Sequence, residues 1–297
     1  MEFIWHIIIM ICVWLPGSLS YTLVFGRGKI LHFGPVALSL AATYGTFLTI
    51  AATESYALGI LVGVLIAIFM SLLFAALSFR LDMESFGIVS IAMHLMVLAI
   101  ILNWNALTRG ALGLPNIDRA PLPNDLGSLA FVLFLIAAAC VACMWALSRS
   151  SFGRALTALA EQEHVAGALG VSRKRIYTLT FLCAGLINII GAILSTQYFG
   201  LLHPNDFLFS SVIFYIMLVV AGKPGSILGV TLSTILLVSL REGIRFIQVP
   251  QWTDIGWILA PIPSAVLGPS RLILFGVILF VAVWVRRDTL FPQKRII

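Results

Sequence analysis

Two cysteines stand at a spacing that can support metal or redox chemistry. Cys140 and Cys143 form a C-x-x-C pair, but no second Cys or His pair lies near them in the sequence. A tetrahedral metal site needs that second pair. All four cysteines of the chain, which include Cys12 and Cys183, fall within apolar runs. We therefore predict that they fill space between helices, and we expect no metal and no bound cofactor.

The sequence also lacks a phosphate-binding loop motif. Gly222-Lys223-Pro224 resembles part of a phosphate-binding loop, but Pro follows Lys and no glycine stands five positions before Gly222. We expect no ATP hydrolysis by this chain. The mixture of Gly, Pro and Ser over Gly222–Gly229 predicts a break between two helices. A hinge and a simple turn are both compatible with it.

Polar side chains are rare inside the long apolar runs, and the few that occur are candidates for lining a solute path. We predict such a path at Tyr44, His94, Asn188 and Tyr215. The alternative is a side chain that hydrogen-bonds one helix to another, which is the usual role of polar residues in membranes. Carboxylates are not expected between the ends of the spans, and this argues against a proton relay.

The composition assigns the chain to the membrane. Of its 297 residues, 61% are hydrophobic and 10% are charged, whereas soluble domains carry roughly 25% charged residues. Apolar runs of about 20 residues satisfy their own backbone groups only as helices. We predict a polytopic all-α bundle of 8–10 transmembrane helices in a single domain, residues 1–297. The net charge of +6 does not indicate nucleic acid, because most positive charge lies at span ends.

Hydropathy predicts nine membrane spans, of which the seventh and eighth are short for a hydrocarbon core of about 30 Å. The predicted spans are Phe3–Val24, Gly34–Ala52, Ala57–Phe79, Glu84–Asn103, Gly127–Leu147, Ile176–Phe199, Phe207–Ala221, Ser226–Leu240 and Leu272–Val285. Gly256–Gly268 could be a further re-entrant or interfacial piece. Gly59 and Gly63 in the third span predict close helix packing.

Lys and Arg set the orientation of these spans, because cytoplasmic loops are enriched in both. An external N-terminus leaves five of the 18 outside: Arg109, Arg119, Arg241, Arg245 and Arg271. The other thirteen then lie inside. This orientation makes 104–126 an irregular external loop rich in Pro and Gly. It also places Arg241–Trp257 outside, with Trp252 and Trp257 at the headgroup level.

One polar stretch, GRALTALAEQEHVAGALGVSRKRIY at Gly153–Tyr177, then falls on the cytoplasmic side. Its apolar residues recur at helical spacing, Ser150 or Ser151 can cap its start, and Gly170 is suited to its end. A helix that lies on lipid carries Lys and Arg on its polar face, but this one carries Glu161 and Glu163. We therefore favour a docking helix for a cytoplasmic protein over a lipid-surface helix.

Five motifs in order resemble the permease subunits of branched-chain amino acid ABC importers. The strongest is R-A-L-x-A-x-A-E-x-x-x-x-A-x-x-L-G-V at Arg154–Val171, followed by three basic residues and a span at Thr178–Leu194. Four other segments resemble motifs of the same family and occur in the family's order. They are Phe33–Tyr44, Thr108–Pro115, Ala221–Gly229 and Leu272–Phe280. The short external loop and the tail resemble the M-type of the two paired permeases, although Ala221, Lys223 and Pro224 depart from the family pattern.

This resemblance implies a non-catalytic subunit in the inner membrane that moves branched-chain amino acids or a related small solute. Its implied partners are a cytoplasmic ATPase dimer, which holds the ATP, a second permease of the same or another sequence, and an extracytoplasmic substrate-binding protein. The segment 153–170 would be the coupling helix. Its implied ATPase contacts are Ala158, Glu161, Glu163, Ala166 and Gly170. The alternative function is an ion-coupled secondary transporter, which would need carboxylates within the spans.

Overall fold

The computed structural model describes residues 2–246, 276, 277 and 281. Nearly all of the ninth predicted span, Leu272–Val285, lies outside the described residues, as does Gly256–Gly268. The prediction of an all-α polytopic membrane protein is confirmed, because six helices are long and apolar enough to cross a membrane. Two two-residue strands, β1 (Leu114–Pro115) and β2 (Leu201–Leu202), pair in antiparallel fashion.

The six long helices coincide with the first six predicted spans. They are α1 (Glu2–Tyr21, continued by the π-helix η1, Thr22–Arg27), α2 (Pro35–Thr53), α3 (Tyr56–Arg80), α4 (Met83–Asn103), α6 (Leu126–Arg149) and α9 (Arg173–Phe199). The seventh and eighth predicted spans are α10 (Phe209–Ala221) and α11 (Ile227–Phe246). α10 has 13 residues and is therefore too short to cross a core of about 30 Å.

Side-chain caps fix the starts of α3, α4, α6 and α9, and of the helix that begins at Ser151. Ser55, Asp82, Asp125, Ser150 and Ser172 each accept a hydrogen bond from a backbone N–H in the first turn that follows. Hydrogen bonds from Ser85 lower the pKa of the Asp82 carboxyl, and hydrogen bonds from Ser128 lower that of Asp125. Of the two serines predicted to cap the segment that begins at Gly153, Ser150 or Ser151, the cap is Ser150.

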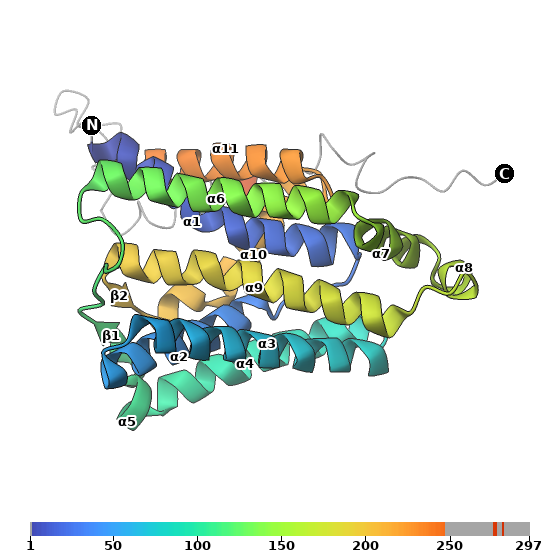
Figure 1. Ribbon diagram of the computed structural model, residues 1–297, viewed down its shortest axis with the longest axis horizontal. Helices are drawn as coiled ribbons and strands as arrows, with labels where there is room; N and C mark the ends of the chain where they lie inside the picture. The colour runs from blue at the N-terminus through green and yellow to red at the C-terminus, as the bar shows by residue number, and fades with distance from the viewer. Residues whose placement is uncertain (1, 247–275, 278–280, 282–297) are drawn as a thin grey trace, which may run out of the picture.

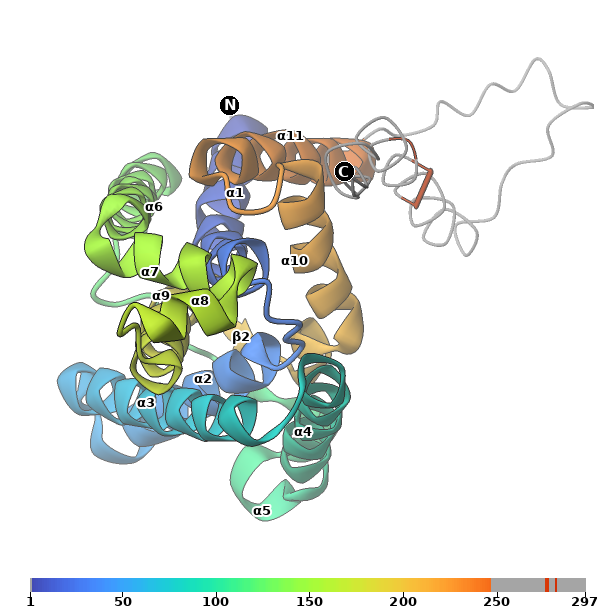
Figure 2. The ribbon, with the colours of Figure 1, turned by 90° about the vertical axis from the view of Figure 1, so that its right-hand side faces the viewer.

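The helices form an elongated bundle with two distinct ends (Figure 1). The N-terminus, α5 (Asn105–Thr108), β1 and β2 lie at one end. The helices α7 (Ser151–Glu161) and α8 (Glu163–Ala168) lie at the other. Seen from the α7–α8 end, α1 is flanked by α6, α10 and α11 (Figure 2). Its close packing against α9 requires Gly191, because a Cβ there would lie 2.5 Å from the carbonyl oxygen of Val13.

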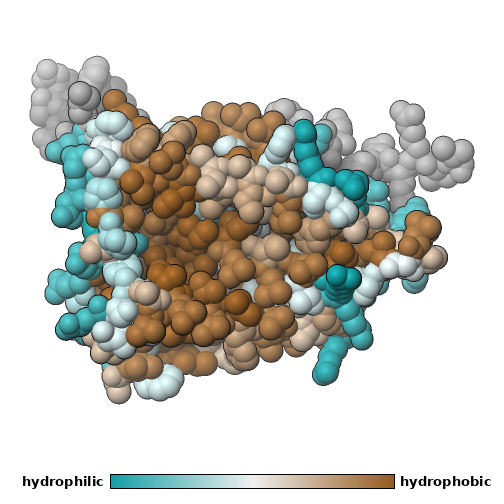
Figure 3. All heavy atoms as spheres, in the orientation of Figure 1, coloured by the Kyte–Doolittle hydropathy of each residue, from teal (hydrophilic) through white to brown (hydrophobic). Residues whose placement is uncertain are grey.

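The surface supports a membrane around the middle of this bundle. A broad apolar belt lies between two ends that carry hydrophilic residues (Figure 3). The Lys and Arg residues of the described chain concentrate at the α7–α8 end. That end holds Arg27, Lys29, Arg80, Arg149, Arg154, Arg173, Lys174, Arg175 and Lys223, against Arg109, Arg119, Arg241 and Arg245 toward the other. The positive-inside rule therefore makes the α7–α8 end cytoplasmic.

Three predicted segments need correction. The single helix predicted over 153–170 is two helices, because Gln162 leaves the helical region (φ −147°, ψ 86°) and lets both pieces turn an apolar side inward. The external loop 104–126 is not wholly irregular, since it contains α5, a 3₁₀ turn (Gly110–Leu112) and β1. Helix α11 continues past Leu240 to Phe246, so the start of the predicted external segment Arg241–Trp257 is helical.

A first re-entrant segment, residues 28–34, enters the bundle from the cytoplasmic end. The backbone N–H of Phe33 donates to Ser90 Oγ (2.9 Å), two turns into α4. The side chain of Asn188, in the middle of α9, donates to the carbonyl of Pro35 (2.8 Å). α2 therefore begins inside the bundle and runs only to the external end. Irregular backbone at this depth is stable because protein groups surround and satisfy it.

A second re-entrant segment, residues 201–208, enters from the external end. It follows the left-handed Gly200 (φ 67°), forms β2 and the 3₁₀ turn η3 (Pro204–Phe207), and leads into α10. The ring of Phe209 lies 6.2 Å from that of His94, in the middle of α4, and 6.0 Å from Phe33. The two re-entrant segments thus meet inside the bundle, and the short α10 needs only to span the remaining cytoplasmic half.

Candidate functional site

The second re-entrant segment forms one wall of a cavity of about 540 Å³. Helices α1, α2, α9, α10 and α11 supply the other walls. This volume lies in the range of small-molecule sites, about 300–1,000 Å³. Asn205, Asp206 and Ser210 line the cavity and are exposed, so small molecules can reach the cavity in this conformation.

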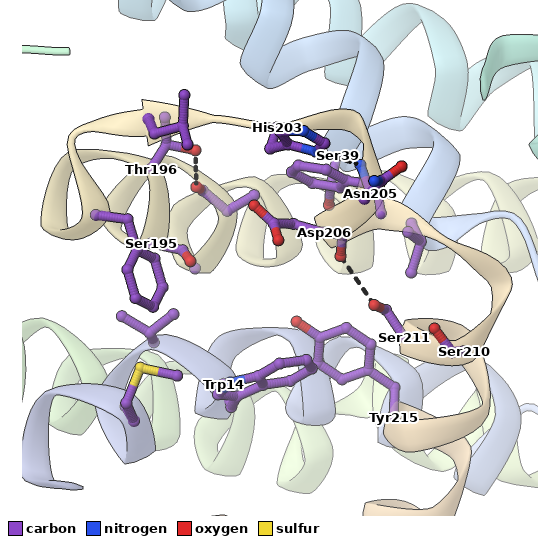
Figure 4. A pocket seen from close by; sticks show the side chains of 18 of the residues that line it. Trp14, Ser39, Ser195, Thr196, His203, Asn205, Asp206, Ser210, Ser211 and Tyr215 are labelled. Atoms are coloured by element: carbon purple, nitrogen blue, oxygen red, sulfur yellow. Dashed lines mark hydrogen bonds between the residues drawn. The ribbon is translucent and has the colours of Figure 1, made fainter. Parts of the chain in front are cut away.

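Polar and aromatic groups face each other across this cavity (Figure 4). His203, Asn205 and Asp206 lie on one wall, and Trp14 and Tyr215 lie on the other. The Ser211 hydroxyl donates to the backbone carbonyl of Asp206 (2.8 Å), which fixes η3 to the start of α10. The arrangement offers a carboxylate, several hydroxyls and an aromatic surface to one small solute.

The aromatic wall is built by tight packing on α1. The ring of Tyr215 stacks on Tyr21 (5.3 Å, 10° between planes) and lies 4.9 Å from the ring of Trp14. It rests directly on Gly17, where any Cβ would collide with the phenol ring. Tyr215 is therefore a firmly packed part of the cavity wall.

The four residues of the predicted solute path lie in different surroundings. Tyr215 lines the cavity. Asn188 makes the buried hydrogen bond to the carbonyl of Pro35 and joins α9 to the first residue of α2 in this conformation. Tyr44 and His94 are buried, and within the described chain the Tyr44 hydroxyl and both His94 ring nitrogens have no hydrogen-bond partner. The path itself stays a prediction, since the structure contains no solute.

Sequence reasoning missed the carboxylates of this region. Asp206 was placed before the seventh span and Glu242 in an external segment, yet Asp206 lines a cavity inside the bundle and Glu242 is fully buried in α11. The shortness of the predicted span Phe207–Ala221 was the available signal. A span that cannot cross the core requires the residues before it to enter the membrane.

Glu242 belongs to a polar contact at the external end of the cavity. Its carboxylate lies 3.6 Å from Nε2 of His6 and 3.9 Å from Nε of Arg241. The other ring nitrogen of His6 shares a hydrogen bond with the hydroxyl of Tyr198 (2.6 Å). The guanidinium of Arg241 also lies over the ring of Trp14 (5.1 Å). These contacts join α1, α9 and α11 where the chain faces the external side.

At the cytoplasmic end, α7 and α8 form a compact unit whose tip projects beyond the long helices (Figures 1 and 2). Leu156 and Leu159 of α7 and Ala166 of α8 are buried against the bundle. The Arg173 guanidinium donates to Glu163 Oε1 (3.0 Å) and to the carbonyl of Ser78 (3.0 Å), which ties α8 to α9 and to the end of α3.

The predicted coupling residues divide into exposed and buried positions. Ala158, Glu161, Glu163 and Gly170 are exposed, and Gly170 adopts the left-handed conformation predicted for the end of the helix (φ 85°). Ala166 is buried, so its side chain holds α8 in place and offers no surface to a partner. Sequence reasoning overlooked Val165 and Leu169, which are 52% and 79% exposed at the tip.

A polytopic helical bundle with a cavity of small-molecule size is compatible with a membrane transport protein. Among the residues that the structure describes, no group of His, Cys, Asp and Glu could hold a metal ion. Residues 3–283 match the family model described as branched-chain amino acid transport system / permease component. The chain belongs to this family of transport permeases.

A shorter match is to a named relative. The chain is 36% identical over 100 residues to the high-affinity branched-chain amino acid transport system permease protein LivM of Escherichia coli (strain K12). The match covers 33% of this chain and 23% of LivM, less than a quarter of that protein's length. No solved structure matches the chain.

Proposed function

We propose that this chain is the membrane-spanning subunit of an ABC importer, and that it forms the path for branched-chain amino acids or a related small solute. Family membership supports a permease role, and the cavity supplies a place for a solute. ATP hydrolysis belongs to a separate cytoplasmic ATPase dimer. A second permease and an extracytoplasmic binding protein complete the proposed assembly in the inner membrane.

The observation that carries the ATPase partnership is the exposed tip of α8. Leu169 and Val165 are exposed large apolar side chains at the α8 tip, which projects beyond the long helices, and Glu161 at the end of α7 is exposed too. Apolar side chains exposed together in water are typical of a protein interaction site. α7 and α8 are also fixed to the ends of α3 and α9 through Arg173, so a force on this tip would reach the membrane helices.

Two matched substitutions test this partnership. Leu169→Asp changes the cytoplasmic tip, and Leu112→Asp makes the same change at an external residue that is 72% exposed. Tagged full-length chains are purified from their native membranes in mild detergent, and ATPase subunits are measured by immunoblot and Mg-ATP hydrolysis. We expect Leu169→Asp to carry about tenfold less bound ATPase than the wild type and Leu112→Asp to carry the same amount. A third variant, Glu161→Lys, changes the charge near the tip and should also carry about tenfold less.

A folding defect is excluded separately. Every variant must elute as a monodisperse peak and keep the melting temperature of the wild type. Full retention of the ATPase by Leu169→Asp would contradict docking at this tip. Absence of an ATPase from the wild-type preparation would contradict the importer proposal and favour an ion-coupled transporter.

A further inference from the structure

Asp206 is an ionisable side chain that lines a cavity inside a membrane bundle, where charged groups are costly to hold. It is exposed to the cavity and projects from η3. Among residues 2–243, whose side chains the structure describes, no Lys or Arg lies within ion-pair distance of its carboxylate. Within that part of the chain, the acid faces the cavity without a cationic ion-pair partner.

Two neighbouring bases already have partners of their own. Nδ1 of His203 accepts a hydrogen bond from the backbone N–H of Asn205 (3.1 Å). The guanidinium of Arg241 lies over Trp14 and Phe214 and near Glu242, so it is already paired.

The wall opposite Asp206 is aromatic, and the guanidinium of Arg241 already lies over its Trp14 ring. Trp14 and Tyr215 present adjacent rings 4.9 Å apart on the facing side of the cavity (Figure 4). Aromatic faces attract ammonium groups, and the attraction grows when the site is shielded from water. A carboxylate on one side and the side chain of Tyr215 on the other are complementary to one small organic cation.

We infer that Asp206 is a solute-binding residue, which takes the ammonium group of the transported molecule between its carboxylate and the side chain of Tyr215. This inference rests on the proposed function, because it assigns a role within the same translocation path. It narrows the solute class to molecules with a primary amine and excludes neutral amides such as urea. The permease itself then contributes to selectivity.

The first test measures the charge of the cavity and does not depend on the solute. Ser210 lines the cavity and is exposed, so Ser210→Cys gives a reporter thiol there after Cys143→Ala removes the exposed native thiol. Full-length protein in membrane vesicles is labelled with cationic aminoethyl or anionic sulfonatoethyl methanethiosulfonate. We expect Asp206→Asn to lower the ratio of cationic to anionic labelling rates by about tenfold. Asp118→Asn, an exposed carboxylate in the external loop, serves as the control and should leave it unchanged.

The second test identifies the group that Asp206 recognises. Leucine, 3-methylbutylamine, 4-methylpentanoate and urea are compared for their ability to slow the labelling of Ser210→Cys. We expect protection by leucine and 3-methylbutylamine only, loss of that protection in Asp206→Asn, and partial return in Asp206→Glu. A melting curve for each variant shows that the fold is retained.

The outcomes separate this inference from the proposed function. An unchanged labelling ratio in Asp206→Asn, or equal protection by leucine with and without the carboxylate, overturns the ammonium site while the importer role stands. A ratio that depends on Asp206 without protection by any branched probe supports the cation subsite and contradicts branched-chain solutes. Protection by urea or 4-methylpentanoate that survives in Asp206→Asn overturns the inference.

Discussion

The two re-entrant segments meet inside the bundle, but they differ in what surrounds them. In residues 28–34, the His32 ring packs against Phe74 (4.5 Å), Phe86 (5.4 Å) and Phe181 (5.1 Å). In residues 201–208, Asp206 faces open space. The cytoplasmic segment is therefore closed by aromatic packing, and the external segment is left open. In this conformation Asn205, Asp206 and Ser210 line the cavity and are exposed, whereas the ring of Tyr215 is packed on Gly17.

The largest expected difference concerns aromatic packing at the two segments. Phe74 is fully buried against His32, and Phe207 of η3 is buried with one side on the cavity. We expect Phe74→Ala to lower the free energy of unfolding by about 3–5 kcal/mol. Phe207→Ala should cost clearly less, because the space it leaves joins a cavity that already exists. Denaturant unfolding in detergent micelles measures both.

Equal losses for the two substitutions would break the comparison. They would mean that η3 is packed as tightly as residues 28–34 and that the cavity contributes nothing to the difference. Phe131→Ala, at a 62% exposed side chain of α6 on the lipid side, is the control and should change the free energy least.

The long helices could be predicted from the sequence, but the re-entrant segments could not. A span is recognised because about 20 apolar residues must satisfy their own backbone groups. Residues 28–34 and 201–208 are short and contain His32, His203 and Asp206, so hydropathy places them in loops. Their depth comes from contacts distant in sequence, such as the hydrogen bond of Phe33 to Ser90.

Some parts of the candidate site could likewise be predicted from the sequence, and others could not. The docking segment was predictable because its caps and helical spacing are local, although the break at Gln162 depends on how α7 and α8 pack on the bundle. The close approach predicted at Gly63 is confirmed, since a Cβ there would collide with the Thr46 hydroxyl. The cavity was not predictable, because its walls come from five helices and a turn that are far apart in the sequence. Tyr215 was found among the candidates and Asp206 was missed.

A pair of serines sharpens the comparison at the level of single hydrogen bonds. Ser90 Oγ accepts from the N–H of Phe33 (2.9 Å) and is fully buried, whereas Ser211 Oγ donates to the carbonyl of Asp206 beside the cavity. Ser90→Ala leaves a backbone donor without its partner inside the bundle, and we expect a loss of about 1–3 kcal/mol of unfolding free energy. Ser211→Ala should cost less than about 1 kcal/mol, because water in the cavity can replace the lost donor. The same unfolding assay applies, and a larger loss at Ser211 would show that the cavity excludes water.

The smallest expected difference is between two asparagines. Asn188 donates to the carbonyl of Pro35 (2.8 Å) where the first segment enters α2, and Asn205 is exposed in the cavity wall. Asn188→Ala should lower the free energy of unfolding by about 1 kcal/mol, the net value of one buried hydrogen bond. Asn205→Ala should leave stability unchanged.

A role of Asn188 in the solute path would appear in a transport assay. The rate of transport per folded molecule would then be lower in Asn188→Ala than in the wild type. If Asn188→Ala costs no stability but slows transport, the hydrogen bond to Pro35 does not secure the segment, and the first segment must open during the cycle. If it costs stability and leaves the rate per folded molecule unchanged, Asn188 is structural, and the closed segment stays closed while solute moves past the external one.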